Sequence, residues 1–196
     1  MRRRALALLL TAGLALASLP AAARAPLDIA ALRMATAGPW EGKLEYLDYS
    51  ANRWFGIPMT VLIEDQGDGV TLIRKAQFDD GPRVGIVRIT TVELFDPATG
   101  QETSASFRKG RETSLDTTTL RLPVPATDAT HWTIVAETTG QDDNRPARLR
   151  QTTVRDGDVM TSLKEIDFLD DEGEAWISRN RTTLRRVAGA KAQPHY

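Results

Sequence analysis

From Trp40 to Val187 the sequence is an almost unbroken series of strand-like segments joined by short turns. In the first segment, apolar or small residues alternate with charged ones: Trp40, Gly42, Leu44 and Tyr46 share one face, and Glu41, Lys43 and Glu45 share the other. A period of two residues is the signature of a strand with one buried face. Turn sequences such as DQGDG, DDGPR and DGD separate the segments, and short loops of this composition join antiparallel strands.

This pattern predicts an all-β fold. About ten consecutive strands would leave two unprotected edges in an open sheet, whereas closure into a barrel removes both edges. We therefore predict an antiparallel up-and-down β-barrel of about ten strands. A β-sandwich is the alternative, and the hairpin-length connections disfavour it. Within the second predicted strand, Pro58 would fit a strand start or a bulge.

A short helix is predicted before the first strand, over residues 26–36. Pro26 suits a first helical turn, and Asp28 is an acidic residue near the helix N-terminus. Gly38-Pro39 then stops the helix. Four apolar residues would line one side of it: Leu27, Ile29, Leu32 and Met34.

The first 23 residues have the order of a secretory signal. Arg2 to Arg4 form the positive region, residues 5–19 are apolar, and Ala21 and Ala23 make a small-x-small cleavage site. We expect cleavage after Ala23, which leaves residues 24–196 as a single barrel domain in the bacterial periplasm or the medium. Cleavage after Ala25 is disfavoured because Pro26 follows, and the apolar stretch is short for a membrane anchor.

Composition narrows the classes of function. The chain has no cysteine, which excludes disulfides, thiolate chemistry and cysteine-ligated metals. Removal of the signal takes away three arginines and no acid, so the net charge changes from −1 to about −4. This balance argues against nucleic acid or an anionic membrane as the main partner. We expect no stable membrane insertion after cleavage.

Three features resemble the calycin group, which comprises the lipocalins and their relatives. A short helix precedes the barrel, Gly38-x-Trp40 opens the first strand, and the last strand, WISRNRTTLRR, is rich in arginine. The GPWEG stretch is also similar to the G-x-W-x-G opening of the ten-stranded nitrobindin-like barrels, and the whole chain resembles small secreted bacterial proteins of unknown function. The lipocalin resemblance implies that Trp40 closes one barrel end beneath a basic residue. Three arginines are candidates for that partner: Arg179, Arg181 and Arg185.

Motifs for catalysis and metal binding are absent. There is no G-x-S-x-G element and no glycine-rich phosphate loop, so we do not expect an enzyme. His131 and His195 lack the spacing of a metal site. Nitrobindin-like barrels ligate haem through a late histidine, but His195 lies ten residues past Arg185 in a tail. We therefore expect no cofactor and no metal, and we interpret the acidic run at residues 170–174 as a turn.

The leading functional hypothesis is that the barrel lumen binds a hydrophobic or amphipathic small molecule or lipid, because ten strands enclose a wider interior than eight. Arg148 and Arg150 share one face of a strand; inward they would make a basic lumen, and outward, which is the default for charged residues, a solvated surface. The alternative is a non-catalytic structural or interaction protein of the envelope with a filled barrel. The candidate ligand-binding residues are Trp40, Tyr46, Trp54, Trp132, Arg148, Arg150, Trp176 and Arg179.

Overall fold

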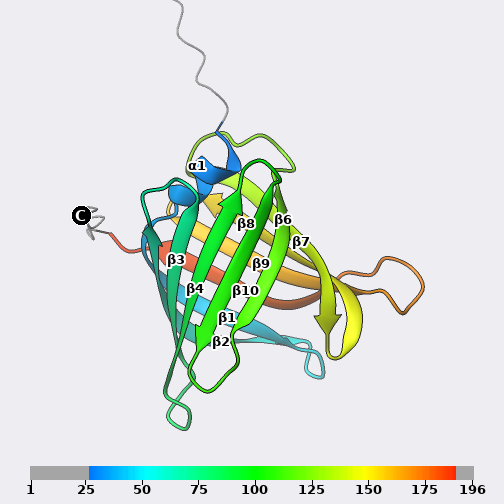
Figure 1. The fold of residues 1–196 in the computed structure, drawn as a ribbon. Helices are drawn as coiled ribbons and strands as arrows, with labels where there is room; N and C mark the ends of the chain where they lie inside the picture. The colour runs from blue at the N-terminus through cyan, green and yellow to red at the C-terminus, as the bar shows by residue number, and fades with distance from the viewer. Residues whose placement is uncertain (1–26, 189–196) are drawn as a thin grey trace, which may run out of the picture.

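The computed structural model describes residues 27–188, which form a closed antiparallel barrel with a short helix at one end (Figure 1). Each strand pairs with its neighbours in the chain, and β1 pairs with β10 to close the ring. The predicted ten-stranded up-and-down barrel is confirmed. The elements are α1 (Ile29–Met34), β1 (Gly38–Asp48), β2 (Arg53–Asp65), β3 (Thr71–Asp79), β4 (Ile86–Asp96), β5 (Gln101–Arg108), β6 (Ser114–Arg121), β7 (His131–Asp142), β8 (Arg145–Asp156), β9 (Val159–Phe168) and β10 (Ile177–Arg186).

Several predictions concern residues outside the described range. The signal at residues 1–23, its cleavage after Ala23, the role of Pro26 and the position of His195 all fall in residues 1–26 or 189–196. They stay predictions.

Helix α1 is shorter than the predicted 26–36. Its N-cap is Asp28, whose carboxylate accepts a hydrogen bond from the Ala31 N–H at 2.8 Å, and such a cap satisfies one of the free donors of the first turn. Leu32 is fully buried in the barrel core, and the other three predicted apolar residues pack against that core. The helix therefore covers one end of the barrel (Figure 1).

The G-x-W-x-G stretch has a packing explanation at each position. Trp40 is 1% exposed and belongs to the core cluster. Gly38 has a φ of +126°, and a Cβ there would lie 2.9 Å from the Arg186 guanidinium. A Cβ on Gly42 would lie only 1.9 Å from the Thr183 carbonyl oxygen. Glycine at both positions lets β10 approach β1 closely enough to close the barrel.

Two strand predictions need correction. From the sequence GQDDNRP, a turn is predicted over residues 140–146, but the β7–β8 turn consists of Asp143 and Asn144 alone, both with positive φ (51° and 59°). Tight hairpin turns of this kind need left-handed residues, which Asn and Asp tolerate. Pro58 lies inside β2 and not at its start. The β2–β3 ladder begins only at Met59, so the missing N–H of Pro58 costs no hydrogen bond on that side.

The barrel wall is weakly joined between β6 and β7. These strands pair through three residues only, with Thr119 to Arg121 facing Glu137 to Val135. Beyond that ladder, the β7–β8 hairpin diverges from β6 at the end of the barrel far from α1 (Figure 1).

Candidate functional site

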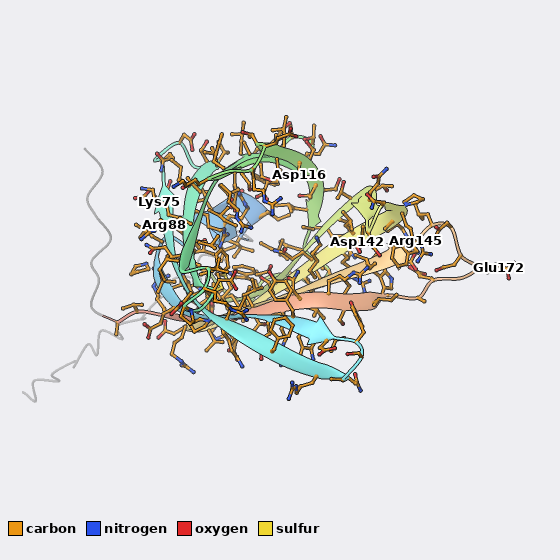
Figure 2. All side chains as sticks on the ribbon, turned by 90° about the horizontal axis from the view of Figure 1, so that it is seen from below. Lys75, Arg88, Asp116, Asp142, Arg145 and Glu172 are labelled. Carbon is orange, nitrogen blue, oxygen red and sulfur yellow. The ribbon has the colours of Figure 1, made fainter. Side chains whose placement is uncertain are left out.

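The barrel encloses a cavity of about 360 Å³, which lies at the lower end of the range for small-molecule sites. Figure 2 looks into the barrel from the end opposite α1, which is flared and is called the open end below. Apolar side chains from most of the strands line much of the cavity: Met59, Val61, Leu72, Ala76, Phe78, Ile89, Leu120, Trp132, Ile134, Ala136, Met160 and Leu184.

A polar band crosses the same cavity on β8, β9 and β10. Register places Thr153, Ser162 and Thr182 in one row across these strands, and the Thr153 and Ser162 hydroxyls are hydrogen bonded at 2.8 Å. The next row, one step toward the open end, holds Gln151, Lys164 and Asn180. Both rows face inward because successive inward residues on a strand are two apart.

An ionic cluster lies in the cavity wall beside α1. Arg33 of α1 contacts Glu102 of β5 at 2.5 Å and Glu93 of β4 at 3.5 Å. Glu93 also pairs with Arg74 of β3 at 2.8 Å. Arg33 further donates to the Val70 carbonyl oxygen at 3.2 Å. The cluster balances two arginines against two glutamates, as buried charges require, and it ties the helix to three strands.

The pKa values of the two glutamates are shifted in opposite directions. Burial raises the pKa of Glu102 to about 7, the negative charge of Glu93 adds to this effect, and the Arg33 contact offsets only part of it. Burial also acts to raise the pKa of Glu93, but Arg74 and Arg33 outweigh it and hold that pKa below its ordinary value. A carboxyl with a perturbed pKa in a cavity is often a functional group; here the ion pairs give a structural cause.

Trp40 seals the end of the barrel beneath α1. Its Nε1 donates to the Thr36 carbonyl oxygen at 2.8 Å. The guanidinium of Arg186 lies 5.1 Å from the ring centroid and that of Arg155 lies 5.5 Å away, both within cation–π range. The predicted capping role of Trp40 is therefore supported, but its three predicted partner arginines are wrong: Arg186 pairs with Trp40 across β1–β10, and Arg155 comes from β8.

Of the eight predicted ligand-binding residues, only Trp132 lines the cavity. Trp40 is buried in the core at the sealed end and does not line the cavity. Tyr46 faces inward but lies at the flared end, where it stacks on Phe55 with ring centroids 5.6 Å apart and remains 37% exposed. Trp54 is on the outer face, opposite in phase to Phe55, with the Arg181 guanidinium 4.3 Å from its ring centroid.

The predicted phase of β1 agrees with the structure, but one residue of its outer face is buried. Glu45 does face away from the lumen, but it is only 6% exposed. Arg181 donates to it at 2.8 Å and Lys43 pairs with it at 2.8 Å. These contacts, the Arg181 hydrogen bond first, lower the pKa of Glu45 below its ordinary value. A charged residue on the outer face, such as Glu45, can therefore be buried by the side chains that pair with it.

Arg148, Arg150 and Trp176 form a group on the outer face, so the default prediction for the arginines is the correct one. Arg148 pairs with Asp167, and Arg150 pairs with Glu165 at 2.9 Å. Arg150 lies 3.8 Å from the Trp176 ring centroid. These arginines cannot make the lumen basic, because they face outward and carboxylates neutralise them.

Arg179 lies far from Trp40. It pairs with Asp142 and donates to the Tyr49 hydroxyl at 3.2 Å, at the open end where Figure 2 shows Asp142. Neither Arg179 nor the Arg148 group reaches the cavity.

Sequence reasoning missed five charged residues that do line the cavity: Arg33, Arg74, Glu93, Glu102 and Lys164. A signal for some of them was present. Arg74 shares its strand phase with Leu72 and Ala76, and Lys164 shares its phase with Met160. A charge in phase with apolar residues indicates an inward-facing group.

Residues 27–188 contain no cluster of three or more potential metal ligands. Within the same range, no helix has the length and hydrophobicity needed to cross a membrane. His131 contacts Asp128 and Asp156 beside the β7 start, and Asp170 of the acidic run pairs with Arg145 at 2.5 Å.

Neither a family model nor a curated protein matches this chain. Among solved structures, the barrel is similar to the crystal structure of Rv2717c from M. tuberculosis, with a TM-score of 0.52 and 16% sequence identity. The match covers 82% of this chain and 99% of that chain. A likeness at this identity establishes a common fold and leaves the activity to be argued from the site.

Proposed function

We propose that this protein binds a small hydrophobic or amphipathic molecule inside its barrel. The observation that carries the proposal is the cavity of about 360 Å³, whose lining combines twelve apolar residues with twelve polar or charged ones. Small-molecule sites combine apolar walls with placed polar groups, and the large polar share of this cavity favours an amphipathic ligand. The lipocalin-like features of the G-x-W-x-G stretch support the same function.

The site is closed at one end and open at the other. The ionic cluster fixes α1 over one end, and Trp40 seals that end from beneath. The opposite end is flared and exposes Tyr46 and Phe55. A ligand would therefore enter from the flared end and place its apolar part toward Trp132 and Leu184.

The test is binding of a neutral fluorescent probe, N-phenyl-1-naphthylamine, whose emission rises in an apolar site. We expect saturable binding to the full chain. Ala136→Phe would place a phenyl ring in the cavity, which Ala136 lines, and should weaken binding. Val154→Phe adds the same ring to the outer face of β8, where Val154 is exposed, and should leave binding unchanged. Equal binding by both variants would contradict a lumen site.

We further propose that the protein is exported. The charged, apolar and small-residue order of residues 1–23 supports this proposal. A bacterial periplasm or medium would then be the source of the ligand.

An interaction protein is the second candidate function. Leu94, Phe107 and Leu115 are exposed on the outer faces of β4, β5 and β6, and Leu115 is 72% exposed. Exposed apolar groups of this kind often mark contact surfaces. This function predicts that Leu115→Ser reduces self-association of the protein in sedimentation velocity, while N-phenyl-1-naphthylamine fails to bind the unsubstituted protein.

A further inference from the structure

We infer that the ligand of the cavity is an amphipathic anion, and that Lys164 holds its anionic group near the open end. This inference rests on the proposed function and adds the chemical class of the ligand. Lys164 lies on β9 among the cavity-lining residues, between Gln151 of β8 and Asn180 of β10.

Above a pH of about 7, where Glu102 with its pKa of about 7 is ionised, the charge balance of the cavity leaves one cation over. Its charged lining residues are three cations, Arg33, Arg74 and Lys164, and two anions, Glu93 and Glu102. Both arginines are already paired with these glutamates. A ligand anion at that end would meet glutamates as closely as arginines, so the arginine cluster offers it no net attraction.

Lys164 differs from the lysines on the outer wall. Lys43 pairs with Glu45 at 2.8 Å, and Lys75 pairs with Glu64 at 2.7 Å. Among residues 27–188, no carboxylate comes within ion-pairing distance of Lys164 and no side chain hydrogen bonds to it; its row neighbours, Gln151 and Asn180, are uncharged amides. A half-buried ammonium without a carboxylate is stabilised by an anion, and the two amides can donate to the same group.

The position of Lys164 also sets the direction of the ligand. The rows on the α1 side of Lys164 are Ser162 and then Met160, and the Met160 row includes Leu184. An anionic group at Lys164 therefore places an attached chain against the apolar walls and toward Trp132. This geometry fits a carboxylate or a similar anionic head on a short apolar tail.

The experiment compares three ten-carbon probes by competition against the neutral fluorescent probe: decanoate, decanol and decylamine. The protein is the full chain and its Lys164→Met, Lys164→Glu and Lys75→Met variants. Lys75 lies on the outer side of the wall (Figure 2), so Lys75→Met removes the same charge without touching the cavity. Thermal unfolding confirms that each variant folds.

We expect the unsubstituted protein to bind decanoate about tenfold more tightly than decanol, the order of effect that a charge-assisted hydrogen bond supplies. Lys164→Met should remove that preference, Lys164→Glu should shift it to decylamine, and Lys75→Met should retain it. If decanol and decanoate bind equally, or if the preference survives Lys164→Met, the inference is overturned while the proposed function stands. If no probe binds, both fail.

Discussion

Replacement of Trp40 by alanine gives the sharpest test of how the barrel end is closed. The indole is almost fully buried, and emptying such a site costs about 3–5 kcal/mol of unfolding free energy. The Thr36 carbonyl would also lose the Nε1 donor. Trp40→Phe keeps a six-membered aromatic ring but removes the pyrrole part of the indole together with that donor, so we expect an intermediate cost of about 1–3 kcal/mol. Glu41 is exposed on the outer face, and Glu41→Ala should change stability by less than about 0.5 kcal/mol.

The assay is urea unfolding followed by far-UV circular dichroism, because tryptophan fluorescence changes with the substitution itself. A constant slope against urea would confirm that only stability has changed. Arg186→Met, combined with Trp40→Ala in a double-mutant cycle, measures the stacking contact, for which we expect a coupling of about 0.5–2 kcal/mol. If Trp40→Ala costs no more than Glu41→Ala, Trp40 does not close the barrel end. If Trp40→Ala and Arg186→Met add independently, Arg186 does not stack on the Trp40 ring.

Three further outcomes are expected. Gly42→Ala should lower the unfolding free energy measured in urea by about 3 kcal/mol or more, because its Cβ would lie 1.9 Å from the Thr183 carbonyl oxygen. The control is Gly56→Ala, whose nearest neighbour is a side-chain atom at 3.4 Å and which should cost far less. Equal costs would contradict the close approach of β10 to β1. The pKa of Glu102 is raised to about 7 in the folded state, so between pH 4.5 and 7 the folded chain holds a proton on Glu102 that the unfolded chain releases. The unfolding free energy relative to Glu102→Gln should therefore fall by up to about 1.4 kcal/mol per pH unit as pH rises from about 4.5 to 7. A pH-independent difference would refute the raised pKa. Mass spectrometry of protein from the envelope fraction or the medium should find Arg24, give or take about two residues, at the mature N-terminus, and an intact Met1 there would refute processing.

The strand count and closure could be predicted because their signals are local. Period-two alternation and turn residues at the hairpins specify which segments pair, and consecutive pairing leads to a ring. The two partners of Trp40 differ in this respect. Arg186 shares the phase of Leu184, and the register shift between Ser178 and Asn180 lies outside the stretch that pairs with β1, so counting along β10 would have placed Arg186 inward. Arg155 could not be predicted in this way, because it reaches Trp40 from a strand that is distant in sequence.

Other errors concern phase and could have been avoided. Ile57, Met59 and Val61 share one face of β2, so counting back places Phe55 inward and Trp54 outward. The aromatic character of Trp54 and Trp176 favoured a lumen role that their positions do not support. Arg33 is different: it enters the cavity wall from a helix that caps the barrel, and its contacts with β4 and β5 depend on how that helix packs.

The short ladder between β6 and β7 determines where the ring opens first. Three residue pairs join these strands, against twelve between β7 and β8. Local opening costs least where the fewest backbone hydrogen bonds break, so amides at the free edges, in residues 114–118 and 138–142, should exchange hydrogen faster than those of β7 that face β8. Such an opening exposes the lumen sideways while the other ladders stay intact. The breathing of this joint would then give a bound molecule a second, lateral way out besides the flared end, one that does not require global unfolding.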